Sequence, residues 1–137
     1  MAGAKPPTTA ELIWSGGARF GATSGTTAIV VDGDGAAGPS PVQAAAIGLA
    51  GCMAADVVAI LEKGRQPLAA LRVSFTGERA ATPPRRFIRI ALHFHVSGVV
   101  ASEAVARAIA LSRETYCSVW HSMRQDIDFV TSFDIHA

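Results

Sequence analysis

The sequence predicts an α+β domain in which an antiparallel sheet wraps a long central helix. The first observation is the order of the patterns, βββ-α-ββ-α-α-β, in which strands and helices do not alternate singly. The second is an almost uncharged segment from 41 to 63, which is typical of a helix surrounded by protein. The third is the length of 137 residues, which suits one domain with its own core. We therefore expect a single domain over residues 1–137, with a loose leader over 1–10.

The first three strands are expected to form a small meander. ELIW at 11–14 begins a strand, the SGG that follows turns the chain, and TTAIVVD at 26–32 is rich in β-branched residues. The segment GDGAAGPSP then marks the end of the meander, because glycine and proline punctuate regular structure.

The long helix is predicted over residues 41–63 from signals at both ends. Ser40 is a good N-cap, and Gln43 completes an S-x-x-Q capping box. Gly64 is expected to take the left-handed conformation beyond the last turn. At 1.5 Å per residue, about 22 residues span roughly 33 Å. Between Gln43 and Glu62 the sequence has one ionisable side chain, Asp56, so we expect protein to enclose this helix on every face.

The second half of the chain predicts two strands, two helices and a closing strand. The two strands flank the polar turn ATPPRR, and each alternates apolar with polar residues. Ser102 is expected to cap a helix that continues to Leu111; the pattern breaks at 113–116, and a short helix begins near Cys117. Residues 126–135 form the last strand. The expected buried faces are Leu71, Val73 and Phe75 in the first strand and Ile88, Ile90, Leu92, Phe94 and Val96 in the second.

The nearly balanced charge argues against partners, such as nucleic acids, that bind to a strongly basic surface. With 12 basic and 11 acidic side chains the formal net charge is +1, so the sequence predicts no nucleic-acid partner. Charged residues make up 17% of the chain, against roughly 25% in typical soluble domains. We therefore expect another subunit to cover part of the surface.

No segment predicts export, a membrane span or a bound cofactor. The N-terminus lacks the apolar core of a signal peptide, so the cytoplasm is the expected location. The apolar run at 44–55 is about half the ~20 residues that a bilayer span requires, so no membrane partner is expected. The glycines at 16–25 match neither phosphate-loop pattern, and no cofactor is predicted.

The two cysteines, Cys52 and Cys117, are the candidate reactive groups. In a reducing compartment a structural disulfide is improbable, which leaves two alternatives: buried apolar fillers or a catalytic pair of thiols. Cys52 lies in the middle of the long helix, where burial raises a thiol pKa, so its activation would need a nearby cation. Cys117 is expected at the start of a short helix, where free N–H groups favour a thiolate.

Other polar residues are candidates for supporting roles. Arg19 lies among glycines, where the backbone can pack closely, and is either the cation for Cys52 or a solvated turn residue. Asp56, one helical turn after Cys52, needs a partner if it is buried. His93 and His95 share a strand face and are possible metal ligands, but no third ligand stands at a telling spacing, so no metal site is predicted.

Taken together, these segments resemble the OsmC/Ohr family of osmotically and peroxide-inducible proteins. The resemblance rests on GPSPVQAAAIGLAGCMAADVVAILEK, PPRRFIRIALHFHVSG, AIALSRETYCSVWHSM and SFDIH, and it extends from Trp14 to Ile135. It implies an intertwined homodimer with two long cysteine-bearing helices at its centre. It also implies reduction of organic hydroperoxides by two cysteines.

The resemblance assigns a role to each of three residues. Cys52 falls on the peroxide-attacking cysteine, Cys117 on the resolving cysteine, and Arg19 on the arginine that holds the attacking thiolate. One position differs, because the family's glutamate at the start of the helix is replaced here by Val42 and Gln43. Gln43 is expected to accept a hydrogen bond from the arginine, and Asp56 to support it.

The resemblance thus leads to a thiol peroxidase acting in oxidative-stress defence, with an external dithiol, lipoyl or other, as reductant. An apolar lining would favour organic peroxides. The alternative is a non-catalytic dimeric binding protein of the same fold that holds an apolar ligand. The residues expected to line the pocket are Phe20, Ile47, Leu49, Met53 and Trp120.

Overall fold

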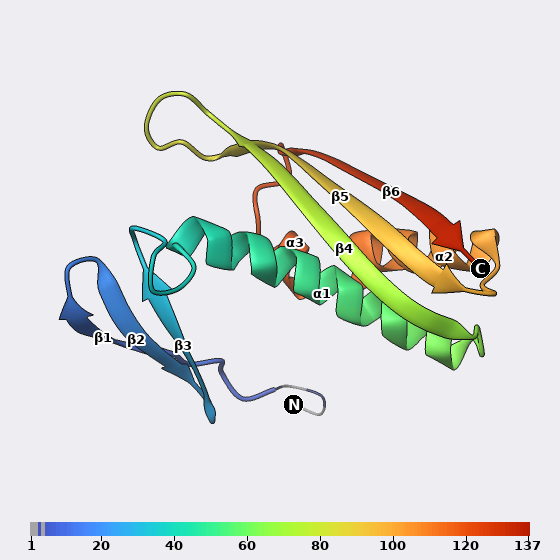
Figure 1. Ribbon diagram of the computed structural model, residues 1–137, viewed down its shortest axis with the longest axis horizontal. Helices are drawn as coiled ribbons and strands as arrows, with labels where there is room; N and C mark the ends of the chain where they lie inside the picture. Colours follow the sequence, from blue (N-terminus) through green and yellow to red (C-terminus); the bar gives the residue numbers. More distant parts are fainter. Residues whose placement is uncertain (1–2, 4) are drawn as a thin grey trace. The chain divides into compact units, whose positions relative to one another are not determined.

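The computed structural model describes residue 3 and residues 5–137, and it has the predicted α+β class (Figure 1). Its contacts divide the chain into two compact units, one up to Ala45 and one over Ala46–Ala137. The helix α1, Pro41–Lys63, begins in the first unit and continues through the second. Residues 5–10 have no regular structure; residues 1, 2 and 4 of the expected leader lie outside the described residues. Whether the chain acts as one domain stays a prediction.

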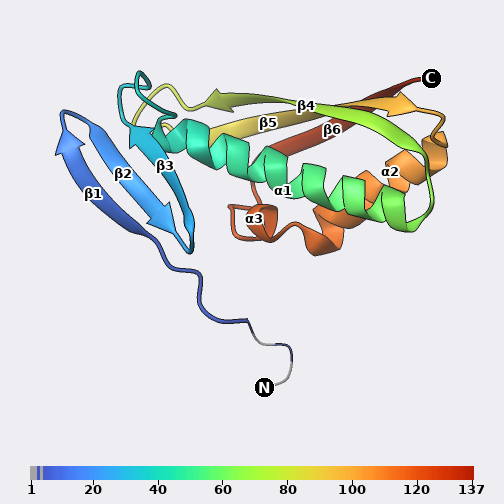
Figure 2. The same cartoon turned by 60° about the horizontal axis from the view of Figure 1, so that its bottom comes forward.

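The small unit is the predicted three-stranded meander (Figure 2). Strands β1 (Glu11–Gly16), β2 (Arg19–Ser24) and β3 (Thr27–Asp32) pair antiparallel in the order β1-β2-β3. Gly17 and Gly25 take φ values of 55° and 58° in the two turns, a conformation that glycine adopts without steric cost. This register makes Arg19 on β2 the direct cross-strand partner of Asp32 on β3.

The capping box at the start of α1 is confirmed. The Ser40 N–H donates to Gln43 Oε1 over 2.9 Å, and the Gln43 N–H donates to Ser40 Oγ over 3.1 Å. Two of the N–H groups at this end of the helix are thereby satisfied within the sequence S-P-V-Q.

The end of α1 differs from the prediction by one residue. Arg65, not Gly64, takes the left-handed conformation, with φ of 56°. The Arg65 N–H donates to the Glu62 carbonyl over 2.9 Å, and the Gln66 N–H donates to the Leu61 carbonyl over 2.9 Å. These two bonds form a Schellman motif in which an arginine occupies the position that usually favours glycine.

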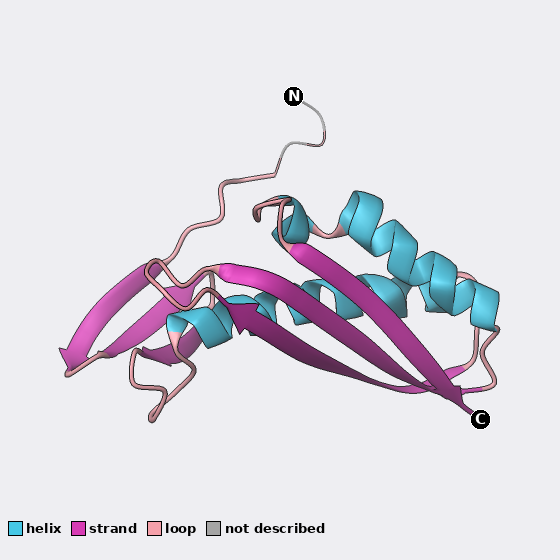
Figure 3. Ribbon diagram, turned by 90° about the horizontal axis from the view of Figure 1, so that it is seen from above, coloured by secondary structure: helices cyan, strands magenta, loops and turns pink. Residues whose placement is uncertain are grey.

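The large unit contains a second three-stranded sheet, ordered β4-β5-β6 (Figure 3). Strand β4 (Leu68–Arg79) pairs antiparallel with β5 (Phe87–Gly98), as predicted. Strand β6 (Asp128–His136) pairs parallel with β5, so the expectation of a purely antiparallel sheet is corrected. The reason is the helical connection between β5 and β6, which crosses back over the sheet before β6 begins, as parallel neighbours require.

This connection contains three helical elements on one face of the sheet (Figures 2 and 3). They are α2 (Ser102–Leu111), the π-helical turn η1 (Ser112–Tyr116) and α3 (Ser118–His121). Ser102 does not cap α2 as expected; Ala101 holds the N-cap position, and its N–H donates to Gln66 Oε1 over 2.9 Å. The predicted break after Leu111 is the π-helical turn, and it delivers Cys117 to the start of α3.

The core of the large unit is built from one stripe of α1, the inner face of the sheet and the helices that follow it. The stripe on α1 consists of Leu49, Met53, Val57 and Leu61, spaced four residues apart. Ile88 is 42% exposed, so the predicted apolar face of β5 is buried only from Ile90 onward. The buried members from the sheet and the connection include Ile90, Leu92, Phe94, Val96, Val105, Ala108, Ile109, Cys117, Trp120, Ile127 and Phe129.

One side of α1 is not covered by the described residues of the large unit. Ile47 is 63% exposed, Gly51 and Ala55 are exposed, and a Cβ added at Gly51 would meet nothing within 4 Å. Within that unit, the prediction that protein encloses this helix on every face is therefore not met. By length and composition α1 could cross a membrane, a property that core helices of globular proteins share.

Candidate functional site

The two cysteines are brought together inside the large unit. Cys52 is partly buried in the middle of α1, and Cys117 is fully buried between η1 and α3. Both are free thiols; Cys117 belongs to the buried core and Cys52 packs against it. The sequence could name these two residues, but their meeting depends on the packing of the connection against α1.

Backbone groups on both sides fix the position of Cys117. Its N–H donates to the Ser112 carbonyl over 2.8 Å, and its carbonyl accepts from the His121 N–H over 3.1 Å. Its sulfur accepts a hydrogen bond of 3.3 Å from the Trp120 N–H and so serves as the N-cap of α3. The thiol therefore has a defined direction before any chemistry takes place.

Burial raises the pKa of the Cys117 thiol to about 11. The neighbouring Cys52 thiol acts in the same direction, while the Trp120 N–H opposes it without compensating. The expectation that the start of a short helix makes Cys117 a thiolate is thus wrong, because desolvation outweighs the N–H groups. With a pKa of about 11, Cys117 keeps its proton at neutral pH.

A buried serine links the two cysteine-bearing segments. Ser112, which is fully buried, donates from Oγ to Asp56 Oδ2 over 2.7 Å, and its carbonyl accepts the Cys117 N–H. Asp56 lies one turn after Cys52 on α1. The partner of Asp56 within the large unit is thus a hydroxyl group. Sequence reasoning missed Ser112, because no pattern marks a buried serine.

Arg19 lies in the small unit, exposed, on β2. Its cross-strand neighbour Asp32 is 2% exposed and accepts hydrogen bonds of 2.9 Å from the Ala37 and Asp34 N–H groups. These backbone bonds, with a smaller contribution from the Arg19 charge, lower the pKa of Asp32 below its usual 3.8. Asp32 is a further residue that the sequence did not single out, and it places a carboxylate beside Arg19.

Gln43 also has a structural partner. Its Oε1 accepts from the Ser40 N–H in the capping box, and Gly35 lies close to the same oxygen. The role of Gln43 as an acceptor for Arg19 stays a prediction.

The residues expected to line a substrate pocket occupy different environments. Leu49, Met53 and Trp120 belong to the buried core, Ile47 is exposed on α1, and Phe20 is partly buried in the small unit. None of the five lines either cavity described for the large unit.

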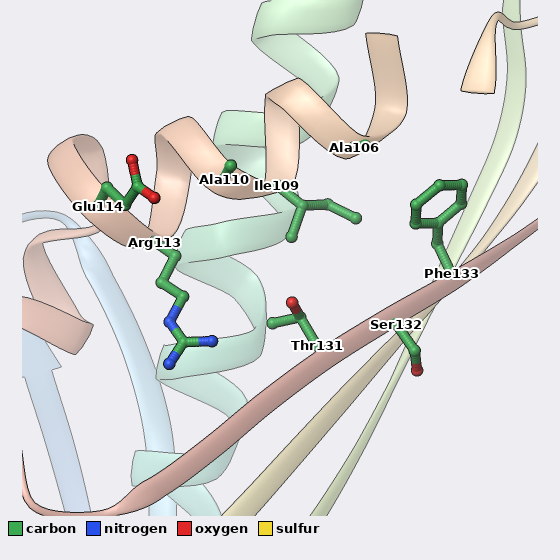
Figure 4. A pocket seen from close by; sticks show the side chains of 8 residues that line it. All are labelled: Ala106, Ile109, Ala110, Arg113, Glu114, Thr131, Ser132 and Phe133. Atoms are coloured by element: carbon green, nitrogen blue, oxygen red, sulfur yellow. The ribbon is translucent and has the colours of Figure 1, made fainter. Parts of the chain in front are cut away.

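The two cavities lie on either side of the connection between β5 and β6. One, about 590 Å³, opens between α2 and β6, where Arg113 extends from the helix toward Thr131 and Glu114 points away (Figure 4). The Arg113 guanidinium lies 4.8 Å from the centre of the Phe129 ring. The other, about 670 Å³, lies beside the second half of α1 and is lined by Asp56, Lys63, Arg107 and Tyr116, among others. Asp56, one helical turn after Cys52, therefore also lines an open cavity.

Three side chains on the outer face of the sheet could hold a metal ion. His93, His95 and Asp134 offer ligand atoms that all lie within 4.8 Å of one another. The third ligand that was missing from the sequence pattern comes from β6, which the parallel pairing places beside β5.

An α+β chain with one free thiol in the middle of a long apolar helix and a second at the start of α3 is the class of protein that the fold and the site define. Comparison with known proteins specifies the class further: the model of the OsmC-like protein family matches residues 32–132. The chain belongs to the OsmC-like family.

The chain is similar to relatives of known and unknown role. It is 39% identical over 131 residues to Protein YhfA of Escherichia coli K12, covering 93% of this chain and 98% of that protein. A hypothetical protein from Aquifex aeolicus has a TM-score of 0.89 at 24% identity, covering 96% and 97% of the two chains. A Legionella pneumophila structure described as an organic hydroperoxide resistance protein OsmC has a TM-score of 0.71 at 21% identity, covering 96% and 98%.

Proposed function

We propose that this protein is a thiol peroxidase that reduces organic hydroperoxides with Cys52 and Cys117. The Cys52 thiolate attacks the distal oxygen of R–O–OH, the O–O bond breaks, and Cys52 sulfenic acid and an alkoxide form; the alkoxide takes up a proton to become the alcohol. The Cys117 thiol then attacks the sulfenic sulfur, which forms the disulfide and releases water. An external dithiol, lipoyl or other, reduces the disulfide and is itself oxidised.

The packing of the two thiols into one core is the observation that supports this proposal. A resolving cysteine must reach the sulfenic acid before a second peroxide does, and Cys52 packs against the core to which Cys117 belongs, near enough to raise the Cys117 pKa. Both cysteines are free, as the resting state of such an enzyme requires.

The different burial of the two thiols supports the order of attack. Cys117 is fully buried and, with a pKa of about 11, protonated at neutral pH, so it is a poor first nucleophile. It is better suited to attack the sulfenic sulfur once Cys52 has reacted. Cys52 is partly buried on α1 and is the better placed of the two for a substrate.

Arg19 is proposed as the cation that pairs with the Cys52 thiolate and stabilises the negative charge that develops on oxygen. In this proposal Asp32 takes over the orienting role of the family's glutamate, because it is the buried carboxylate across the strand from Arg19. Gln43 and Asp56 then have supporting structural roles, one in the capping box and one in the Ser112 hydrogen bond.

We propose that the working form is a homodimer located in the cytoplasm. The support is the uncovered apolar side of α1, with Ile47 63% exposed and free space at Gly51. A second copy of α1 on this side would cover the helix and complete an apolar substrate pocket in which Ile47 takes part. An apolar pocket selects an organic peroxide over a small polar one.

Mass spectrometry of the peroxide-treated protein tests the mechanism. One equivalent of tert-butyl hydroperoxide is expected to consume both thiols and leave a Cys52–Cys117 disulfide. Cys52→Ser should abolish the reaction, and Cys117→Ser should leave a sulfenic acid that dimedone traps. Hydrogen peroxide serves as the comparison and should react more slowly. Two free thiols after treatment would reject the peroxidase proposal and leave the alternative, a dimeric protein that binds an apolar ligand.

A further inference from the structure

The outer face of the large sheet carries a cluster of polar residues that the peroxidase chemistry does not use. His93 and His95 project from β5, and Asp134 and His136 from β6. The parallel register places His95 opposite Asp134, and the alternation of side chains along a strand puts all four on the face opposite Phe94 and Val96. Three of the four histidines in the sequence therefore meet at one carboxylate.

The distances within this cluster are those of a convergent set of ligands. Asp134 Oδ2 lies 3.0 Å from His93 Nε2 and 3.4 Å from His95 Nδ1, and Oδ1 lies 3.3 Å from His136 Nε2. Ligands at ~2.0–2.1 Å from a tetrahedral zinc ion are separated by roughly 3.3–3.4 Å. The cluster thus needs only small side-chain rotations to admit an ion between its members.

Hydroxyl groups support the outer nitrogen of each of the two β5 histidines. His93 Nδ1 lies 2.7 Å from Ser132 Oγ, and His95 Nε2 lies 3.3 Å from Ser74 Oγ. A hydroxyl that accepts the proton on the outer nitrogen leaves the inner nitrogen free to bind a metal. This arrangement of an imidazole ligand and an outer hydrogen-bond partner is typical of metal sites.

One atom of the cluster lacks a hydrogen bond. Asp134 Oδ1 is shielded from solvent and has no hydrogen-bond partner among the described residues, although the ring of His136 is close to it. A buried polar atom without a partner is unfavourable, and an ion bound at this carboxylate would satisfy it. The Arg72 guanidinium donates to Ser74 Oγ over 3.3 Å and is not among the three side chains whose ligand atoms converge.

We propose that His93, His95 and Asp134 form a binding site for a divalent transition-metal ion of the zinc type, with His136 beside the same carboxylate. Imidazole nitrogen and a single carboxylate suit Zn²⁺, whereas Ca²⁺ and Mg²⁺ prefer oxygen ligands. The ion would join β5 to the edge strand β6. The site is separate from the thiols, which lie on the helical side of the sheet.

Zinc retention by the full-length chain tests this site. The protein is freed of metal with a chelator, loaded with one equivalent of ZnCl₂ and dialysed, and its zinc content is measured by mass spectrometry. We expect about one zinc per chain, and at least ~100-fold weaker binding for His95→Ala and for Asp134→Asn. Ser132→Ala should weaken binding ~10-fold, because it removes an outer partner and no ligand.

Two controls separate this site from other metal-binding groups. His121→Ala removes the one histidine outside the cluster, whose Nε2 contacts the Arg113 carbonyl, and should bind zinc as the wild type does. The double variant Cys52→Ser/Cys117→Ser should also retain zinc, and Co²⁺ in the wild type should show d–d bands without thiolate charge transfer. Far-ultraviolet circular dichroism verifies that each variant is folded. Loss of zinc during dialysis of the wild type, or undiminished zinc binding in folded His95→Ala, would overturn the proposal.

Discussion

Ser112 Oγ donates a 2.7 Å hydrogen bond to Asp56 Oδ2 and thereby joins the π-helical turn to α1 one helical turn beyond Cys52. The same serine accepts the Cys117 N–H at its carbonyl. Ser112 is thus bonded both to the helix that carries Cys52 and to the backbone of Cys117. The relative position of the two cysteines therefore depends on the Ser112–Asp56 hydrogen bond, in which neither cysteine takes part.

Replacing this serine tests the link. Ser112→Ala leaves Asp56 without its hydroxyl partner, and a hydrogen bond to a charged group is worth about 1.5–3 kcal/mol. We expect the free energy of unfolding in urea to fall by this amount and peroxide-driven disulfide formation to slow. Ser122→Ala is the matched control, because Ser122 is exposed and bonds only to the carbonyl of Ser118; it should change stability by less than about 0.5 kcal/mol. Equal stability of the two variants would show that the link is unimportant.

The high pKa of Cys117 predicts how the reduced protein reacts with alkylating agents. Because the pKa rises from 9.0 to about 11, the fraction of Cys117 present as thiolate at neutral pH falls ~100-fold. Iodoacetamide at about pH 8 is therefore expected to leave Cys117 unmodified in the folded protein. In urea-unfolded protein it should react as an ordinary thiol. Peptide mapping of the products measures the difference, and rapid native labelling of Cys117 would show that it is not buried in solution.

The same shift predicts a loss of stability in alkali. A thiol whose pKa is higher in the folded state contributes stability below its unfolded pKa of 9.0, and this contribution disappears as the pH rises through about 11. The free energy of unfolding should fall more steeply over this range in the wild type than in Cys117→Ala. Parallel curves for the two proteins would contradict the assignment.

Some parts of this arrangement could be predicted from the sequence because their causes are local. The capping box of Ser40 and Gln43 and the break in the pattern before Cys117 each depend on a few neighbouring residues. The pairing of β6 with β5 depends on a crossover through three helical elements, so neither the parallel direction nor the meeting of Asp134 with His93 could be inferred.

The pKa shift of Cys117 could not be predicted from the sequence either, because it depends on residues that are distant in the chain. The position of Cys117 at the start of α3 was predicted, but the sign of its pKa shift depends on burial by residues from other elements. Asp32 and Ser112 were missed because an aspartate at the end of a strand and a serine before a helix break are usually exposed, and here both are buried.

Asp32 predicts a contribution to stability that is lost in acid. The N–H groups of Ala37 and Asp34 lower its pKa, so its carboxylate stabilises the fold above about pH 3.8, and this stabilisation declines as the pH falls through the lowered value. Asp32→Asn cannot titrate and should show a weaker dependence of unfolding free energy on pH between about pH 4 and about pH 2.5. Asp34→Asn, at an exposed neighbour, is the control and should follow the wild type. If both variants follow the wild type, Asp32 is not hydrogen-bonded as described.

The left-handed Arg65 predicts a stabilising substitution. A residue with a Cβ is strained at a φ of 56°, and glycine is not, so Arg65→Gly is expected to raise the free energy of unfolding by about 0.5–1 kcal/mol. Arg65→Ala removes the same charge but keeps the Cβ, and should bring no such gain. Thermal and urea unfolding of the three proteins decide the matter; a loss of stability in Arg65→Gly would mean that the arginine side chain has a stabilising contact that outweighs the strain.

Gly51 lies on the uncovered side of α1, and its replacement by leucine distinguishes a monomer from a dimer. The substitution should stabilise a monomer and disrupt a dimer. A Cβ at Gly51 meets nothing within 4 Å among the described residues. Glycine is less favourable than alanine in a helix by about 0.8–1 kcal/mol, and leucine ranks close to alanine, so Gly51→Leu should stabilise an isolated chain. If a second copy of the helix packs on this side, the added side chain blocks its approach, and we expect dissociation. Gly51→Ala adds helix propensity with little bulk and should leave the assembly largely intact. Light scattering coupled to size exclusion measures the mass of each variant, and a Gly51→Leu protein with unchanged mass and greater stability would show that no partner helix covers this face.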